Sequence, residues 1–200
     1  MKVIKVLPQG FASNSYILTQ DNKSAVVVDP AEPRIIKVLA ENKLSCKFVL
    51  LTHGHFDHVG GCGVLYESGA KICCGENEKD LIFSRENLSI FGGVKIPRFE
   101  ISQTFKDREE VELCGIKFKI ISPPGHTAGS VCYIAEDCIF SGDTLFQESV
   151  GRTDLPTGNS RELIASVKKL FSLKGDYKIY CGHEGDTTLQ HERNFNPYIR

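Results

Sequence analysis

The sequence predicts a mixed α/β protein in which helices cover β-sheet. Runs rich in β-branched and apolar residues alternate with amphipathic stretches in the order strands, helix, strand, helix, strands, helix, strand. Such alternation is typical of folds in which layers of helix pack on layers of sheet. A length of 200 residues fits one domain, 1–200. With 24% charged and 41% hydrophobic residues, the composition is that of a globular rather than a disordered chain.

The first half of the chain contains short strands separated by turn-forming residues. We expect these strands at residues 3–7, 15–18, 24–29, 47–51 and 71–74. The run at 47–51 is continuously apolar, which is the pattern of a strand buried on both faces. Helices are expected at 33–40, where a proline can occupy the first turn, and at 59–68.

The second half begins with the least periodic segment, residues 76–106. We interpret it as a loop-rich insertion, helical at most in its first half, that could border a cleft. Strands then return, at 112–114, 117–121, 130–135, 138–141 and 178–181. Apolar residues at helical spacing predict an amphipathic helix at 162–173. A terminal helix is expected at 188–195.

A cluster of histidines is the strongest chemical signal in the chain. Three of the six histidines, His53, His55 and His58, fall within the segment THGHFDH, and Asp57 lies beside them. The segment follows a predicted buried strand and precedes a predicted helix. Such a loop, held by a rigid scaffold, can turn several side chains toward one centre.

Three further candidate ligands, His126, Asp143 and His183, have the same kind of position. Each lies close behind a short predicted strand, and each is preceded by glycine. We interpret His191 differently, as an ordinary hydrogen-bonded polar residue on the terminal helix.

This set of side chains indicates a pair of divalent cations. Five histidines and two aspartates offer imidazole and carboxylate ligands, which suit Zn²⁺, Fe²⁺ or Mn²⁺. Seven ligands exceed the four of a tetrahedral zinc site, but they fit two ions that share one carboxylate and retain open positions. Two ions ~3.5–4 Å apart can hold a bridging water and lower its pKa toward ~7. We therefore expect two ions, zinc first and iron or manganese as alternatives, that supply hydroxide for hydrolysis.

The motifs also resemble those of a known family. THGHFDH at 52–58 looks like the HxHxDH signature of the metallo-β-lactamase superfamily. Later motifs of that family match, in order and at suitable spacing, GHT at 125–127, GDT at 142–144 and GH at 182–183. The glyoxalase II-like hydrolases are the branch that most resembles PGHTAGS at 124–130, SGDTLF at 141–146 and GRTD at 151–154.

The resemblance implies a four-layer αββα sandwich, the metallo-β-lactamase fold, with metals at one edge of the paired sheets. It implies two ligand sets and a bridge: His53, His55 and His126; Asp57, His58 and His183; and Asp143 between them. Asp57 would also orient the attacking hydroxide. The implied reaction is hydrolysis of a small thioester such as S-D-lactoylglutathione.

Two departures from the glyoxalase II pattern concern substrate binding. Full-length members carry a C-terminal helical domain that supplies basic residues for glutathione, whereas this sequence ends soon after its last ligand motif. Those members also place a lysine and a tyrosine after the bridging aspartate, where Arg152 and Asp154 stand here. Arg152 could clamp a substrate carboxylate through its planar guanidinium or serve as a structural ion-pair partner.

Charge and hydropathy argue against several kinds of partner. The formal net charge is -1 and no long basic run occurs, so nucleic-acid or membrane binding has no electrostatic support. No segment approaches the ~20 apolar residues of a membrane span, and the apolar run at the N-terminus is too short for a signal peptide. Most of the eight cysteines lie in apolar strand-like segments. This predicts buried thiols in a reducing cytoplasm.

Alternatives to a thioester hydrolase remain open. A mononuclear iron persulfide dioxygenase of the same superfamily would need only His53, His126 and Asp143, leaving the second ligand set without a role. A lactonase or phosphodiesterase would use the same ligands on another substrate. Ribonucleases of the superfamily add a basic arm or second domain, and flavodiiron-type modules usually have glutamate in place of His55. A metal-bound scaffold without activity is the remaining hypothesis.

Overall fold

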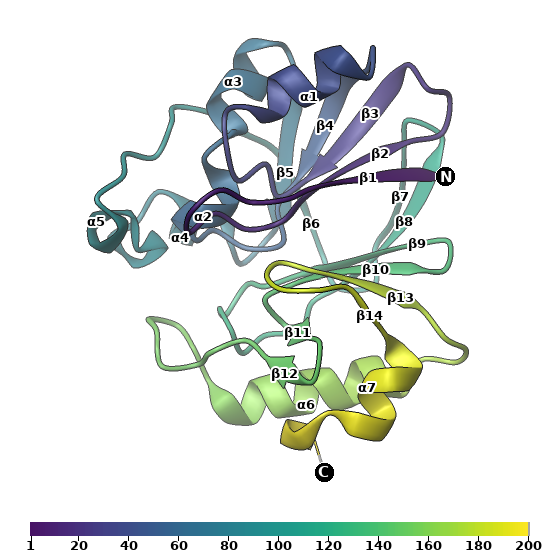
Figure 1. Cartoon of the computed structure of the whole chain (residues 1–200). Helices are drawn as coiled ribbons and strands as arrows, with labels where there is room; N and C mark the ends of the chain where they lie inside the picture. Colours follow the sequence, from purple (N-terminus) through teal and green to yellow (C-terminus); the bar gives the residue numbers. More distant parts are fainter. Residues whose placement is uncertain (200) are drawn as a thin grey trace.

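The computed structural model, which describes residues 1–199, consists of two six-stranded sheets packed face to face between layers of helix (Figure 1). The first sheet has the strand order β1-β2-β3-β4-β5-β6, and the second has the order β14-β13-β10-β9-β8-β7. In Figure 1, α1 and α3 cover the upper sheet, and α6 and α7 cover the lower one. The predicted αββα sandwich is therefore confirmed.

The first sheet is formed by the N-terminal half of the chain. Its strands are β1 (Lys2–Val6), β2 (Ser15–Thr19), β3 (Ser24–Val28), β4 (Ser45–Leu50), β5 (Lys71–Gly75) and β6 (Ile101–Phe105). The helices of this half are α1 (Ile35–Glu41), α2 (Phe56–Val59), α3 (Cys62–Glu67), α4 (Lys79–Ile82), η1 (Arg85–Asn87) and α5 (Ser89–Gly92). Strands β3 to β6 run parallel to one another, whereas β1 and β2 pair antiparallel with their neighbours.

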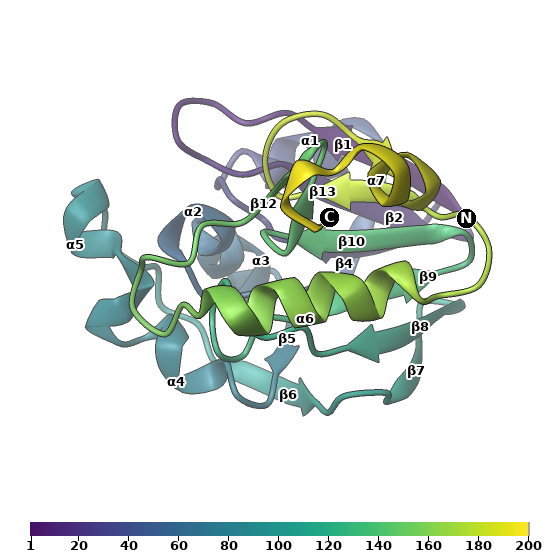
Figure 2. The ribbon, with the colours of Figure 1, turned by 90° about the horizontal axis from the view of Figure 1, so that it is seen from below.

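The second sheet is formed by the C-terminal half. Its strands are β7 (Glu110–Leu113), β8 (Ile116–Ile121), β9 (Cys132–Ala135), β10 (Cys138–Gly142), β13 (Lys178–Cys181) and β14 (Thr187–Thr188). A separate hairpin contains β11 (Leu145–Phe146) and β12 (Ser149–Val150). The remaining helices are α6 (Ser160–Phe171), α7 (Leu189–Phe195) and η2 (Pro197–Ile199). Figure 2 shows α6 lying across the outer face of this sheet.

Alternation along the strands divides the apolar side chains between three layers. Successive side chains of a strand point to opposite faces of its sheet. In β3, Val27 packs toward the helices of the first half, whereas Val26 and Val28 pack between the two sheets. In the second sheet, Phe140 likewise enters the layer between the sheets, whereas Ile139 packs beneath α6. Both faces of each sheet are thus buried, which explains the nearly continuous apolar runs in the sequence.

Helix α6 shows how local sequence places a covering layer. The side chain of Asn159 accepts hydrogen bonds from the backbone N–H groups of Arg161 and Glu162, which caps the first turn. Leu163, Val167 and Leu170 then recur at helical spacing and are buried against the second sheet. Predicted and observed bounds of this helix differ by two residues at each end.

Two sequence predictions need correction. The segment 76–106 is not loop-rich throughout, because its end forms β6, the edge strand of the first sheet. Three of its five residues are exposed, so β6 lacks the apolar pattern that marks the inner strands. The helix predicted at 59–68 is two short helices, α2 and α3, and the first begins inside the histidine motif at Phe56.

Two further features bear on the expected surroundings of the protein. All eight cysteines are unpaired thiols, and seven of them are buried, as their apolar sequence settings predicted. Among residues 1–199, no helix combines the length and the hydropathy needed to cross a membrane.

Candidate metal centre

The predicted ligands meet because the strands before them end at the same edge of the fold. Within the second sheet, β10 and β13 are parallel, and β8 has the same direction because β9 is antiparallel to both β8 and β10. The loops after these three strands carry His126, Asp143 and His183. After β4, in the facing sheet, the THGHFDH segment occupies the loop and the start of α2. Residues far apart in the sequence therefore converge on one centre.

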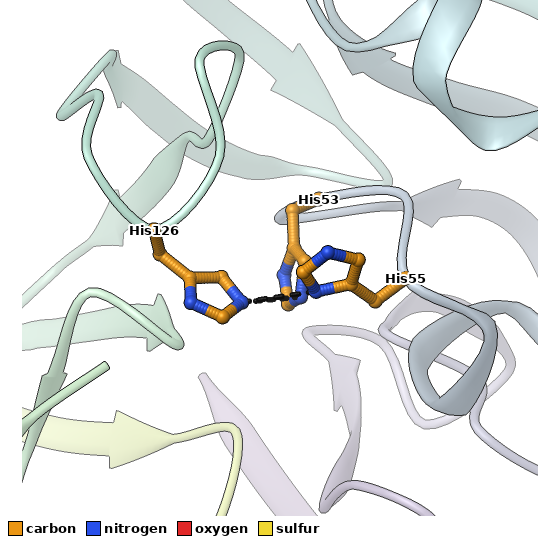
Figure 3. A group of neighbouring side chains, drawn as sticks. All are labelled: His53, His55 and His126. Carbon is orange, nitrogen blue, oxygen red and sulfur yellow. Dashed lines mark hydrogen bonds between the residues drawn. The ribbon is translucent and has the colours of Figure 1, made fainter. Parts of the chain in front are cut away.

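Three histidines form the first group. His53 and His55 extend from the loop after β4 and face His126 from the opposite loop (Figure 3). The Nε2 atom of His126 lies 3.2 Å from Nε2 of His53 and 3.0 Å from Nδ1 of His55. All three side chains are buried. Three ring nitrogens thus approach one another closely, as the ligands of a single cation do.

Asp57, His58 and His183 form the second group, and their ligand atoms lie within 4.8 Å of one another. The Oδ2 atom of Asp57 lies 3.2 Å from Nε2 of His183 and 3.9 Å from Nε2 of His58. His58 is fully buried, whereas Asp57 and His183 are half-buried and line a cleft.

Asp143 lies between the two groups. Its Oδ2 atom is 3.5 Å from Nε2 of His126, in the first group, and 3.5 Å from Nε2 of His183, in the second. Its Oδ1 atom is 3.3 Å from Nε2 of His58. Oδ2 therefore lies near both groups, and Oδ1 lies near the second group. The structure therefore brings together all seven predicted ligands, with Asp143 in the central position.

Hydrogen bonds on the far side of the rings fix which nitrogen points into the centre. Nδ1 of His126 lies 2.8 Å from the backbone carbonyl oxygen of Arg152, which can only accept, so the proton is on Nδ1. Nδ1 of His53 lies 3.1 Å from the hydroxyl of Thr52, which donates its own proton to Asp29 and therefore accepts one from Nδ1. In both rings Nε2 is left as the lone-pair nitrogen that a metal requires.

Asp29 is a buried carboxylate that sequence reasoning did not assign to the site. Its Oδ1 atom accepts a hydrogen bond from the backbone N–H of Thr52 at 2.8 Å, and Oδ2 accepts one from the Thr52 hydroxyl at 2.6 Å. Oδ2 also lies 2.9 Å from Nδ1 of His58. One carboxylate thus orients His58 directly and His53 through Thr52. A signal was present, since Asp29 follows the buried run Val26-Val27-Val28, as the ligand loops follow theirs.

Glu78 is a second unpredicted carboxylate, and it joins the two loops that carry the first group. Its side chain is 0% exposed. Oε1 accepts a hydrogen bond from the backbone N–H of Gly54 at 2.7 Å, and Oε2 accepts one from the Thr127 hydroxyl at 2.9 Å. Burial raises the pKa of Glu78 to about 7 despite these hydrogen bonds. Glu78 lies outside every motif of the sequence, so no local pattern marked it.

Gly54 allows the first loop to pack tightly against α4. A Cβ atom at this position would lie 2.7 Å from Cγ1 of Ile82 and 2.9 Å from Cδ2 of Leu81. Glycine therefore leaves room for a neighbouring helix, which holds the loop between His53 and His55 in place.

The two groups differ in charge because their surroundings differ. Burial, followed by the charges of neighbouring histidines, lowers the pKa of His53 well below its ordinary value. Burial and His126 likewise lower the pKa of His55 to about 3. Burial opposes protonation of His58 too, but the carboxylates of Asp143, Asp29 and Asp57 raise its pKa well above the ordinary value. His53 and His55 therefore offer neutral imidazoles, whereas His58 holds a proton that a cation would displace.

The residues fit a pair of divalent cations. Among the side chains of residues 1–199, Nε2 of His58 and Oδ1 of Asp143 are buried without a hydrogen-bond partner, although they face each other. Buried polar atoms normally have partners. Imidazole and carboxylate ligands at this density are the combination that Zn²⁺, Fe²⁺ and Mn²⁺ prefer. The donor set thus has the composition and the unsatisfied atoms of a candidate metal centre.

The remaining predicted residues lie outside this cluster. Arg152 and Asp154 line the cleft but bind each other, with Nε to Oδ1 at 2.7 Å and an Nη to Oδ2 at 2.6 Å. Both side chains are largely exposed. His191 lies on α7, where its Nε2 is 3.0 Å from Oε1 of Glu148.

Comparison with known proteins agrees with this geometry. The sequence profile of the metallo-β-lactamase superfamily matches residues 8–183, a range that includes all seven predicted ligands. The chain belongs to the metallo-β-lactamase superfamily. It is 36% identical to the hydroxyacylglutathione hydrolase GloC of Haemophilus influenzae, over 98% of this chain and 97% of that protein. It is 33% identical to a hydroxyacylglutathione hydrolase of Photobacterium profundum, over 92% of this chain but 66% of that longer protein.

Solved structures of this superfamily resemble the chain over nearly its whole length. BLEG-1 B3 metallo-β-lactamase superposes with a TM-score of 0.92 at 29% identity, covering 99% of both chains. TTHA1623 in a di-iron-bound form has a TM-score of 0.86 at 30% identity, covering 99% of this chain and 100% of that one. ETHE1 from Myxococcus xanthus has a TM-score of 0.82 at 25% identity, covering 98% and 84%. The protein is therefore a metallo-hydrolase of this superfamily with glyoxalase II-like relatives.

Proposed function

We propose that this metallo-β-lactamase-superfamily protein is a binuclear metal-dependent hydrolase of small thioesters, such as S-D-lactoylglutathione. The observation that carries the proposal is the position of Asp143. Its carboxylate lies within 3.5 Å of His126 in one ligand group and of His183 in the other. Two triads with a shared carboxylate suit two ions rather than one. The hydroxyacylglutathione hydrolases among the relatives support a thioester as substrate.

We propose that His53, His55 and His126 hold one ion, that Asp57, His58 and His183 hold the other, and that Asp143 bridges them. Two divalent ions, zinc first and iron or manganese as alternatives, would supply hydroxide at neutral pH and polarise the substrate carbonyl. Asp57 lies at the cleft, where its carboxylate can accept a hydrogen bond from the attacking water and orient it. In the reaction, the acyl carbon gains a hydroxyl, the C–S bond breaks and the thiol leaves with a proton.

The proposal is tested by elemental analysis of the purified protein and a substrate panel. We expect close to two divalent ions per chain and turnover of S-D-lactoylglutathione, measured by release of free thiol. The panel should also contain lactones and phosphodiesters, because the same ligands serve these reactions elsewhere in the superfamily. If the protein hydrolyses a lactone or a phosphodiester but none of the thioesters, the proposed thioester substrate is refuted and the hydrolase remains. One ion per chain would refute the binuclear centre.

A mononuclear iron persulfide dioxygenase is the second candidate. It would need only His53, His126 and Asp143. The structural similarity to ETHE1 is the observation that favours this candidate. The second group argues against it, since Asp57, His58 and His183 converge without a role in such an enzyme. One iron per chain, with O₂ uptake on addition of glutathione persulfide, would favour the dioxygenase over the hydrolase.

We also propose that the protein acts in a reducing compartment such as the cytoplasm, on small molecules rather than nucleic acid or membranes. Eight unpaired cysteines support the compartment. A net charge of -1 offers no excess of basic residues for a polyanion such as nucleic acid, which supports a small-molecule substrate.

A further inference from the structure

The cleft over the candidate metal centre is large enough for a substrate of considerable size. Its volume is about 1170 Å³, and it reaches from Asp57, Asp143 and His183 out to the loop between β1 and β2 and to α5. Figure 2 shows this loop and α5 at the same end of the molecule. Ligand pockets of ~300–1,000 Å³ are typical for small molecules. The cleft therefore extends well beyond the candidate metal ligands, and its outer part can contact the rest of a substrate.

Two phenylalanines dominate the outer part of the cleft. Phe11, on the loop between β1 and β2, is 90% exposed, and Phe91, on α5, is 86% exposed. Both line the cleft, together with Leu88 and Leu155. Exposed aromatic side chains that gather at the mouth of a cavity indicate a surface that another apolar group covers.

The same outer part holds no unpaired cation. Histidines aside, the charged residues that line the cleft within residues 1–199 are Asp57, Asp143, Arg152, Asp154 and Glu184. The first two belong to the metal centre. The guanidinium of Arg152 binds both carboxylate oxygens of Asp154, at 2.6 and 2.7 Å, so this pair has no net charge. Glu184 adds a negative charge. A glutathione thioester, which carries two carboxylates, finds no free basic partner here.

From this combination we propose that the cleft selects uncharged thioesters with an apolar chain, and that Phe11 and Phe91 determine this preference. The proposal rests on the thioester hydrolysis proposed above and narrows its substrate class. The apolar chain lies against the two aromatic rings, which removes apolar surface of both partners from water. The Arg152–Asp154 pair stays intact and contributes no charge to recognition.

Four thioesters test the preference, combining a lactoyl or a hexanoyl group with glutathione or with neutral N-acetylcysteamine. Initial rates are followed by thiol release, with the metal-loaded enzyme. We expect the highest kcat/KM for hexanoyl-N-acetylcysteamine and the lowest for lactoylglutathione. If lactoylglutathione is instead the best of the four, the preference is refuted while the hydrolase remains. If no thioester is turned over, the hydrolase and the preference are both refuted.

Variants assign the preference to residues. Phe11→Ser and Phe91→Ser should each raise KM for the hexanoyl substrate about tenfold, with little change in kcat and little change for lactoylglutathione. Phe195→Ser is the matched control, because Phe195 is 54% exposed on α7 and does not line the cleft. An unchanged KM in both variants refutes the role of the rings. If Phe91→Ser instead converts a dimer to a monomer, Phe91 belongs to a contact between copies and its role in the substrate preference is refuted.

Arg152→Gln tests whether Arg152 only pairs with Asp154 or also binds a substrate carboxylate. If Arg152 is occupied by Asp154, this variant leaves the ratio of kcat/KM between the glutathione and N-acetylcysteamine substrates unchanged. A selective rise of KM for both glutathione thioesters would show that Arg152 clamps a substrate carboxylate, and the proposal would be overturned.

Discussion

Replacing Glu78 by glutamine tests whether a buried carboxylate joins the two loops of the first histidine group. Glutamine keeps the shape of the side chain and one acceptor oxygen for the N–H of Gly54. Its amide can donate to the hydroxyl of Thr127, which can in turn donate to the hydroxyl of Ser130, 2.7 Å away. The variant should therefore fold, although it loses the ionisation of this position and the hydrogen bond that Glu78 accepts from the backbone of Gly129. The lost hydrogen bond lowers stability by the same amount at every pH, so the pH dependence reports the ionisation alone.

The magnitude follows from the pKa of Glu78. Burial raises it from an ordinary value of 4.5 to about 7. Between these values the unfolded chain has lost the proton and the folded protein still holds it, so this group lowers stability as pH rises. At 1.36 kcal/mol per pKa unit, the loss approaches ~3 kcal/mol and is complete above pH 7. In Glu78→Gln this contribution is absent.

The assay is urea unfolding of metal-free protein at pH 4.5, 6 and 8, because bound cations nearby would lower the pKa of Glu78. The stability of Glu78→Gln relative to the unmodified protein should rise by ~3 kcal/mol from pH 4.5 to pH 8. Glu67→Gln removes a carboxylate from an exposed position and controls for net charge. A stability difference between the two proteins that stays constant across this range would refute the reasoning.

Three further predictions concern the metal centre. Asp57→Ala or His58→Ala should abolish thioester turnover, because each removes a proposed ligand, while the far-UV circular dichroism stays native; unaltered turnover in either variant would reject its role. Asp29→Asn should weaken metal binding ~10–100-fold, because asparagine has one acceptor oxygen in place of the two that accept hydrogen bonds from Thr52 and His58. A competition titration with a chromophoric chelator measures this, and a change below about twofold would contradict the role of Asp29. Prolonged chelation should remove activity and added Zn²⁺ should restore it, whereas full activity of protein shown to be metal-free would exclude a metal-dependent reaction.

The histidine motif was predictable because its members are close along the chain. His53, His55, Asp57 and His58 lie within six consecutive residues, so their clustering is visible without any knowledge of the fold. His126, Asp143 and His183 were recognisable by a shared setting, a glycine after a short apolar strand. The superfamily motifs then supplied the order that links these separate loops. The alternation of strands and helices predicted layers of helix on sheet, and the resemblance to the superfamily implied the αββα sandwich.

Other parts of the site had no sequence signature. Glu78 lies in the segment between β5 and β6, and its importance comes from hydrogen bonds with Gly54, 24 residues before it, and Thr127, 49 residues after it. Strand β6 was missed for a related reason, since an edge strand is covered on fewer sides and tolerates polar residues. No sequence pattern marks Phe11 and Phe91, because their exposure at one cleft is a property of the tertiary structure.

The sequence by itself determined the chemistry of this protein: which side chains can bind cations, and that they follow apolar strands. Only the tertiary structure decided their geometry, including the central position of Asp143, the hydrogen bonds of Asp29 and Glu78, and the pairing of Arg152 with Asp154. The physical reason is that ligand type is a property of single residues. The convergence of these side chains in space, in contrast, depends on how the strands of the two sheets are directed and paired. That arrangement is fixed only when the chain folds and buries both faces of each sheet.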